Sequence, residues 1–175
     1  MRTPLVFTFV GADQPGLVEK LSRTVAAHGG NWLESRMSEL AGQFAGIVQV
    51  EVPSQQADAL RAGLLALSAH KLSVVVADPA AASDQGAVRH LRLTIVGNDR
   101  PGIVREVSHA LATRAISVSE MDTSITSAPM SGDPLFEAVA RIQVPLALDL
   151  DELNTQLDAI ADALTVHIDL EESLR

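Results

Sequence analysis

The residues best suited to chemistry lie in a short stretch that occurs twice. Leu5 to Gly16 reads LVFTFVGADQPG, and Leu91 to Gly102 reads LRLTIVGNDRPG. In each copy an apolar, strand-like run stops at a glycine, crosses an aspartate, and continues after Pro-Gly as a segment of helical period. The backbone amides at the start of such a helix are suited to binding a carboxylate or another anion. Each turn is therefore a candidate ligand site.

The aspartates of these turns, Asp13 and Asp99, are the carboxylates to consider first. We expect each to cap the helix that follows it, because aspartate is favoured at the N-cap and complements the helix dipole. Catalysis by either carboxylate is the weaker alternative. Pro15 is expected in the first turn of the first helix, where its missing N–H group has no cost.

The glycines of the turns admit two readings. They can leave outward-facing amides free to hold an anion, or they can serve only tight turn geometry and close packing. Both readings stay open from spacing alone. The glycines are Gly11, Gly16, Gly97 and Gly102.

Asn31 is a further candidate, because it follows Gly29-Gly30 at the start of a predicted strand. Its amide offers a donor and an acceptor to the amino and carboxylate groups of a ligand. The commoner use of such an asparagine is to close a turn. The second copy has Ser117 at the matching position.

Other kinds of site lack support in the sequence. There is no cysteine, and the five histidines show no metal-binding spacing, so we expect no metal and no cofactor. Neither the Gly-x-Ser-x-Gly elbow nor the phosphate-loop pattern occurs. A formal net charge of −9 argues against direct binding to nucleic acid, which depends on lysine and arginine.

The elements that position these residues follow one order twice: strand, helix, strand, strand, helix, strand. Ser54 is expected to cap the second helix of the first copy. This order predicts an α+β chain of two ferredoxin-like units, each with a four-stranded antiparallel sheet and two helices on one face. The expected strands are 5–10, 32–40, 44–52 and 72–76 in the first copy, and 91–96, 116–125, 135–144 and 166–170 in the second.

The repeat divides the 175 residues into a first domain of residues 1–77, a linker of residues 78–88 and a second domain of residues 89–175. Each domain is small, so we expect the domains to pack on each other or on a second chain. The first apolar run is too short for a signal peptide or a membrane span. We therefore expect a cytoplasmic protein without membrane contact.

The two stretches VGADQPG with GGNW, and VGNDRPG with ISVSE, resemble ACT domains, which are regulatory modules that commonly bind amino acids. The stretch GGNWLESRMSELAGQFAGIVQVEV is similar to a subfamily with two such domains and no attached enzyme. The resemblance implies a non-catalytic regulator with glycine as effector and a transcription activator as protein partner. A homo-oligomer, expected to be a dimer, is implied as well.

In that family the effector pocket lies at an interface between domains. Arg100 is attractive there because a guanidinium can hold a carboxylate with two hydrogen bonds, although a solvated surface arginine is as plausible. The serine at position 117 weakens the case for a second site. The implied ligand-binding residues are Gly11, Ala12, Asp13, Gln14, Pro15, Gly16 and Asn31, with Asn98, Asp99, Arg100, Pro101 and Gly102 in the second copy.

Two other functions are kept as alternatives. The first is an enzyme of the acylphosphatase type on the same fold, which would use an arginine, Arg2 or Arg36, together with Asn31 on a phosphate group. The second is an oligomerisation scaffold that responds to no small molecule. Turnover of acyl phosphates would reveal the enzyme, and an absence of ligand response would favour the scaffold.

Overall fold

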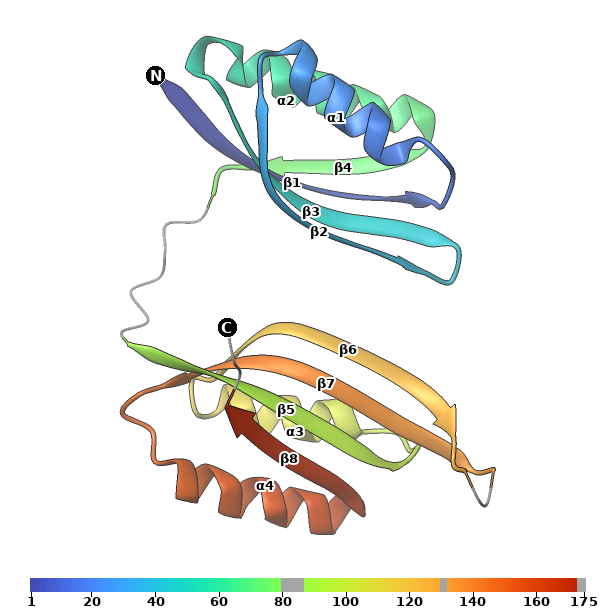
Figure 1. Ribbon diagram of the computed structural model, residues 1–175, viewed down its shortest axis with the longest axis vertical. Coiled ribbons are helices and arrows are strands. Elements are labelled where there is room, and N and C mark those ends of the chain that lie inside the picture. Colours follow the sequence, from blue (N-terminus) through green and yellow to red (C-terminus); the bar gives the residue numbers. More distant parts are fainter. Residues whose placement is uncertain (80–86, 130–131, 173–175) are drawn as a thin grey trace. The chain divides into compact units, whose positions relative to one another are not determined.

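A computed structural model describes residues 1–79, 87–129 and 132–172 of the chain. The chain divides into two compact units, Met1–Ser83 and Asp84–Arg175. Most of the expected linker, residues 80–86, lies outside the described residues. Each unit has the predicted order of elements, as Figure 1 shows.

Within its described residues, the first unit has four strands, two α-helices and two short 3-10 helices, one before and one after the second α-helix. Its antiparallel sheet has the strand order β2-β3-β1-β4, and both α-helices cover one face of the sheet (Figure 1). Its elements are β1 (Arg2–Ala12), α1 (Leu17–Ala27), β2 (Asn31–Leu40), β3 (Gln43–Pro53), η1 (Ser54–Gln56), α2 (Ala57–Ala66), η2 (Leu67–His70) and β4 (Leu72–Ala77).

The second unit repeats this arrangement with the order β6-β7-β5-β8. The prediction of two ferredoxin-like α+β domains is therefore confirmed. Five of the eight strands begin before their expected first residue, and all eight end at or beyond the expected last one. The elements of the second unit are β5 (Val88–Asn98), α3 (Ile103–Ala112), β6 (Ser117–Ser127), β7 (Pro134–Pro145), α4 (Leu150–Leu164) and β8 (Val166–Glu172).

Alternating residues of the central strands build each core. On β1, Leu5, Phe7 and Phe9 are buried against the helices, while Val6 and Val10 lie on the other face and are partly or fully exposed. This period of two is the signature of a sheet with one covered face. The helices supply the opposite wall of the core with residues three or four positions apart: Leu17, Leu21, Val25, Leu60 and Leu64 in the first unit, and Ile103, Val107, Leu111, Leu153 and Leu157 in the second.

The expectation that Asp13 and Asp99 cap the helices is wrong. The N-caps of α1 and α3 are Gly16 and Gly102, with φ angles of 90° and 106° and no side-chain cap. Three residues separate each aspartate from its helix, because Pro-Gly forms a turn with the glycine in a left-handed conformation. For the same reason Pro15 precedes the helix instead of lying in its first turn.

Ser54 also differs from its expected role. It begins η1, and the N-cap of α2 is Gln56, which has no side-chain cap. The Ser54 hydroxyl donates to the Met1 carbonyl at 3.2 Å and accepts from the Thr3 hydroxyl at 2.8 Å. These bonds fix the end of β3 to the start of the chain, so the serine is not available to the helix.

Candidate functional site

The two glycines of each turn have separable roles. A Cβ atom placed on Gly11 would lie 2.9 Å from Leu72 Cδ1 and 3.1 Å from the Lys71 carbonyl, whereas one on Gly16 would meet nothing within 4 Å. Gly11 therefore permits the close approach of β1 to β4, and Gly16 permits the positive φ of the turn. The packing reading holds for the first glycine, and the second faces open space.

Free amides lie at the start of α1. The first bond of the helix runs from the Lys20 amide to the Gly16 carbonyl, at 3.0 Å. The amides of Leu17, Val18 and Glu19 precede that bond, and no side chain caps the helix. They form a site of partial positive charge suited to an anion.

A hollow of about 290 Å³ lies beside these amides. Leu17 and Phe44 give it apolar surface, and the carboxylates of Asp13 and Glu19 line it as well; Arg23 pairs with Glu19 at 3.1 Å. It combines free amides, carboxylates and apolar surface, so it has partners for the carboxylate, the ammonium and the side chain of an amino acid. Its full lining is Asp13, Gln14, Gly16, Leu17, Val18, Glu19 and Phe44.

Some of these lining residues escaped the sequence analysis. Leu17, Val18 and Glu19 follow the quoted turn directly, so extending the motif into the helix would have included them. Phe44 lies opposite Gly11 on β3. That pairing depends on the register of β1 and β3, which the sequence alone does not specify.

The turn of the second unit has the same backbone but different side chains around it. The Arg100 guanidinium donates to the Ala163 carbonyl in the last turn of α4, at 2.9 Å. One donor of the guanidinium is therefore used within the second unit, and the ligand contact expected of Arg100 stays a prediction. The other predicted residues of this turn, Asn98, Asp99 and Pro101, are exposed.

Asn31 lies at the opposite end of the sheet from the turn of its own unit. Glu51 on β3 is opposite both Asn31 and Pro4, whereas Gly11 is opposite Phe44. The seven residue steps from Pro4 to Gly11 correspond to about 23 Å along an extended strand. One domain therefore does not bring Asn31 and the turn together.

The residues of the enzymatic alternative are engaged within the first unit. Arg2 donates to the carbonyls of Gly29 and Glu51, both at 3.2 Å, and its Nε lies 3.0 Å from the Glu51 carboxylate. Arg36 pairs with Glu34 at 2.9 Å. These partners hold both guanidiniums on protein groups instead of leaving them open to a phosphate.

Within residues 1–79, 87–129 and 132–172, no three His, Asp or Glu side chains are grouped so that they could hold a metal ion. In that same part of the chain no helix is long and apolar enough to cross a membrane.

Residues 3–77 match the family model of the ACT domain. A structure of an unknown protein from Galdieria sulphuraria is 28% identical, with a TM-score of 0.88, and the alignment covers 99% of this chain and 100% of that one. A protein provisionally assigned as a glycine cleavage system transcriptional repressor is 20% identical, with a TM-score of 0.73, over 100% of this chain and 99% of that one. The comparison with curated proteins gives no match.

Proposed function

We propose that this chain, whose residues 3–77 match the family model of the ACT domain, is a non-catalytic regulator that binds a small amino acid and controls gene expression through a protein partner. The observation that carries the proposal is the hollow beside α1, where uncapped helix amides and the Asp13 carboxylate line the same space. The amides suit the α-carboxylate of the ligand, and Asp13 suits its ammonium group. Glycine is the first effector to test.

The complete pocket is formed between domains of two chains. The turn holding Asp13 and the amide of Asn31 lie at opposite ends of one sheet, so a ligand that contacts both must lie between the first domains of two copies. Such an effector favours the assembled state by its difference in affinity for the assembled and separated chains. A homodimer is the smallest assembly that provides this pocket.

The protein partner is proposed on two grounds. The net charge of −9 disfavours a phosphate backbone, so control of transcription would act through a protein such as a transcription activator. The likeness over the full length to a protein provisionally assigned as a glycine cleavage system repressor also agrees with such a role. The proposed location is the cytoplasm.

Calorimetric titration of the full chain with glycine and serine tests the proposal. We expect heat of binding with one of these amino acids. Binding should be about tenfold weaker or worse in Asp13→Asn, because the substitution removes the negative charge that pairs with the ligand's ammonium group and nearly keeps the shape of the side chain. The matched variant Asp99→Asn carries the same change in the second turn, and it should leave the first site intact.

Mixing two variants distinguishes the shared pocket from a pocket within one domain. Asn31→Ala and Asp13→Asn should each bind weakly alone. In an equimolar mixture that exchanges at random, half of the dimers are mixed and each has one intact pocket of two, so roughly a quarter of the strong sites should return. A mixture that binds no better than its components would exclude the shared pocket. No binding of any tested amino acid would favour the scaffold alternative.

A further inference from the structure

Four charged side chains form one line across the open face of the second sheet. Arg92 on β5 is directly opposite Arg141 on β7. Arg141 is opposite Glu120 on β6, and Arg92 is opposite Glu171 on β8. The row therefore reads acid, base, base, acid across all four strands. It lies on the face away from the core, because the neighbouring residues Leu93, Met121 and Leu170 pack into the core on the other face.

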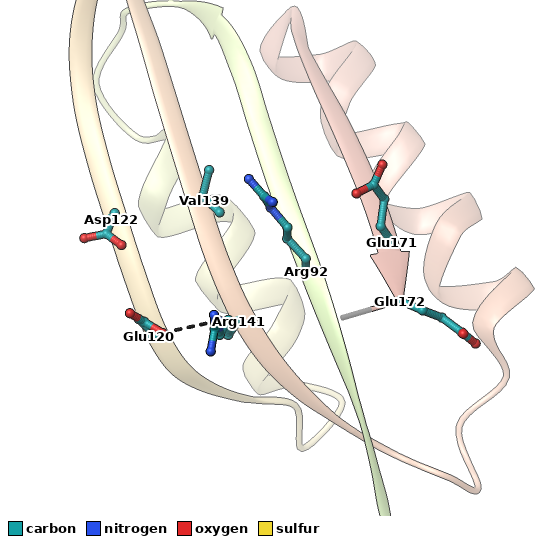
Figure 2. A pocket seen from close by; sticks show the side chains of 7 residues that line it. All are labelled: Arg92, Glu120, Asp122, Val139, Arg141, Glu171 and Glu172. Carbon is teal, nitrogen blue, oxygen red and sulfur yellow. Dashed lines mark ion pairs between the residues drawn. The ribbon is translucent and has the colours of Figure 1, made fainter. Parts of the chain in front are cut away.

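This row lines a hollow of about 430 Å³ in the sheet surface. Figure 2 shows the two arginines on the central strands, with Glu120 and Asp122 on one side and Glu171 and Glu172 on the other. Val139 provides the apolar part of the lining. All of these residues belong to the second unit, so the hollow is complete within it.

The two arginines are unequally paired. The Nε atom of Arg141 lies 3.4 Å from Glu120 Oε2. Among the residues that the structure describes, Arg92 has neither an ion pair nor a side-chain hydrogen bond. Like charges that face each other on adjacent strands disfavour the sheet. A carboxylate held between the two guanidiniums would remove this repulsion and satisfy the unused donors.

The first unit provides an internal comparison. Its matching row is Glu34, Gln49, Val6 and Ala77. A smaller hollow of about 150 Å³ occurs at the same place, lined in part by Val6, Glu34 and Gln49. The hollow therefore belongs to the repeated fold, and the pair of arginines belongs only to the second copy.

The charges of the lining select the class of ligand. Two arginines and four carboxylates give the lining a formal charge of −2, so an anion alone is disfavoured. A carboxylate is suited to the centre of the row, and cationic groups are suited to both acidic sides. We propose that the open face of the second domain binds a free diamino acid, with its carboxylate on Arg92 and Arg141 and its two ammonium groups toward the flanking carboxylates.

Calorimetric titration of the full chain with lysine at low ionic strength tests this site. Exposed charges are least screened under that condition. Norleucine lacks the second ammonium group, and 1,5-diaminopentane lacks the carboxylate, so both should bind at least about tenfold more weakly than lysine. Equal binding of lysine and 1,5-diaminopentane would overturn the proposal, because the arginines would then have no role.

The double variant Arg92→Val with Arg141→Gln gives the second row the central residues of the first row. The sheet should still form, since the first domain already folds with Val6 and Gln49 at these positions, and its far-ultraviolet circular dichroism should match that of the original chain. Lysine binding should fall at least about tenfold. Unchanged lysine binding in this folded variant would contradict the site.

The variant Asp13→Asn distinguishes this site from the effector pocket proposed for the first domain. That variant should lose affinity for glycine and keep its affinity for lysine, and the arginine double variant should do the reverse. If lysine binding is lost in Asp13→Asn and unchanged in the arginine double variant, lysine binds at the turn of the first domain instead. That result would overturn the site on the sheet face and leave the proposed function standing.

Discussion

Each repeated turn has two glycines, five residues apart, with different roles. The second of the two leaves space for a ligand, and the first does not. A Cβ atom on Gly97 would lie 2.6 Å from Val166 Cγ1 and 2.8 Å from Val166 Cα. Gly102 has a φ of 106° and open surroundings. The first glycine is thus a packing requirement between β5 and β8, and the second shapes the start of α3.

The substitution Gly97→Ala should therefore destabilise the second domain. The clash includes the backbone of Val166, so β8 must move, and overpacking of this kind costs about 1–3 kcal/mol of unfolding free energy. Urea unfolding of the full chain, followed by circular dichroism, measures the change. The exposed Ser124→Ala on β6 is the control and should lie within about 0.5 kcal/mol of the original chain. An unchanged midpoint for Gly97→Ala would refute the packing role.

At the residue scale the sequence predicted the location of the turns better than the roles of their side chains. The aspartates have the right type for a cap, but Pro-Gly moves the helix start three residues away from them. Arg100 has the right type for a ligand clamp, yet its guanidinium bonds to the Ala163 carbonyl, 63 residues distant in the chain. Such contacts depend on tertiary structure, which local spacing does not specify.

Among the elements, helices α1 and α3 begin differently from helix α4. Helices α1 and α3 start at a left-handed glycine without a side-chain cap. Helix α4 starts at Asp149, whose Oδ1 accepts a hydrogen bond from the Asp151 amide at 2.9 Å. Among the helices that the structure describes, the two that follow a repeated turn thus combine a left-handed glycine cap with amides free for a ligand.

Removing the cap of α4 should lower stability, whereas removing the carboxylate beside α1 should not. Asp149→Ala leaves the Asp151 amide without its partner, and we expect a loss of about 1 kcal/mol in unfolding free energy. The comparison variant Asp13→Ala should change it by less than about 0.5 kcal/mol, because Asp13 does not cap α1. Thermal unfolding of both variants without ligand is the measurement. An equal loss for Asp13→Ala would restore its predicted capping role.

Element order and type followed from periodicity alone. The alternation of Leu5, Phe7 and Phe9 with Val6 and Val10 identified both the strand and its buried face. Element ends depend on more than periodicity, because Ser54 has the chemistry of an N-cap but bonds instead to Met1 and Thr3 at the start of the chain. The partner of a terminal polar group depends on which strand lies beside it, and the local sequence does not contain that information.

For the whole molecule, the repeat preserves the fold and changes the open faces of the sheets. The buried positions of β1 and β5 are apolar in both copies. On the open faces, Val6 and Gln49 in the first copy correspond to Arg92 and Arg141 in the second. The duplication was visible in the sequence. The row of charges was not identified, because it requires the register of four strands at once.

The effect of amino acids on thermal unfolding tests the central claim, which is that the first domain is an amino-acid sensor. The full chain would be heated in increasing glycine or serine, with Asp13→Asn as control. We predict that one of these ligands raises the unfolding midpoint of the first domain, with a stabilisation of about 2.7 kcal/mol at a hundred times its dissociation constant. The rise should be smaller in Asp13→Asn. An unfolding midpoint that no amino acid in the panel moves would contradict the account and favour a scaffold.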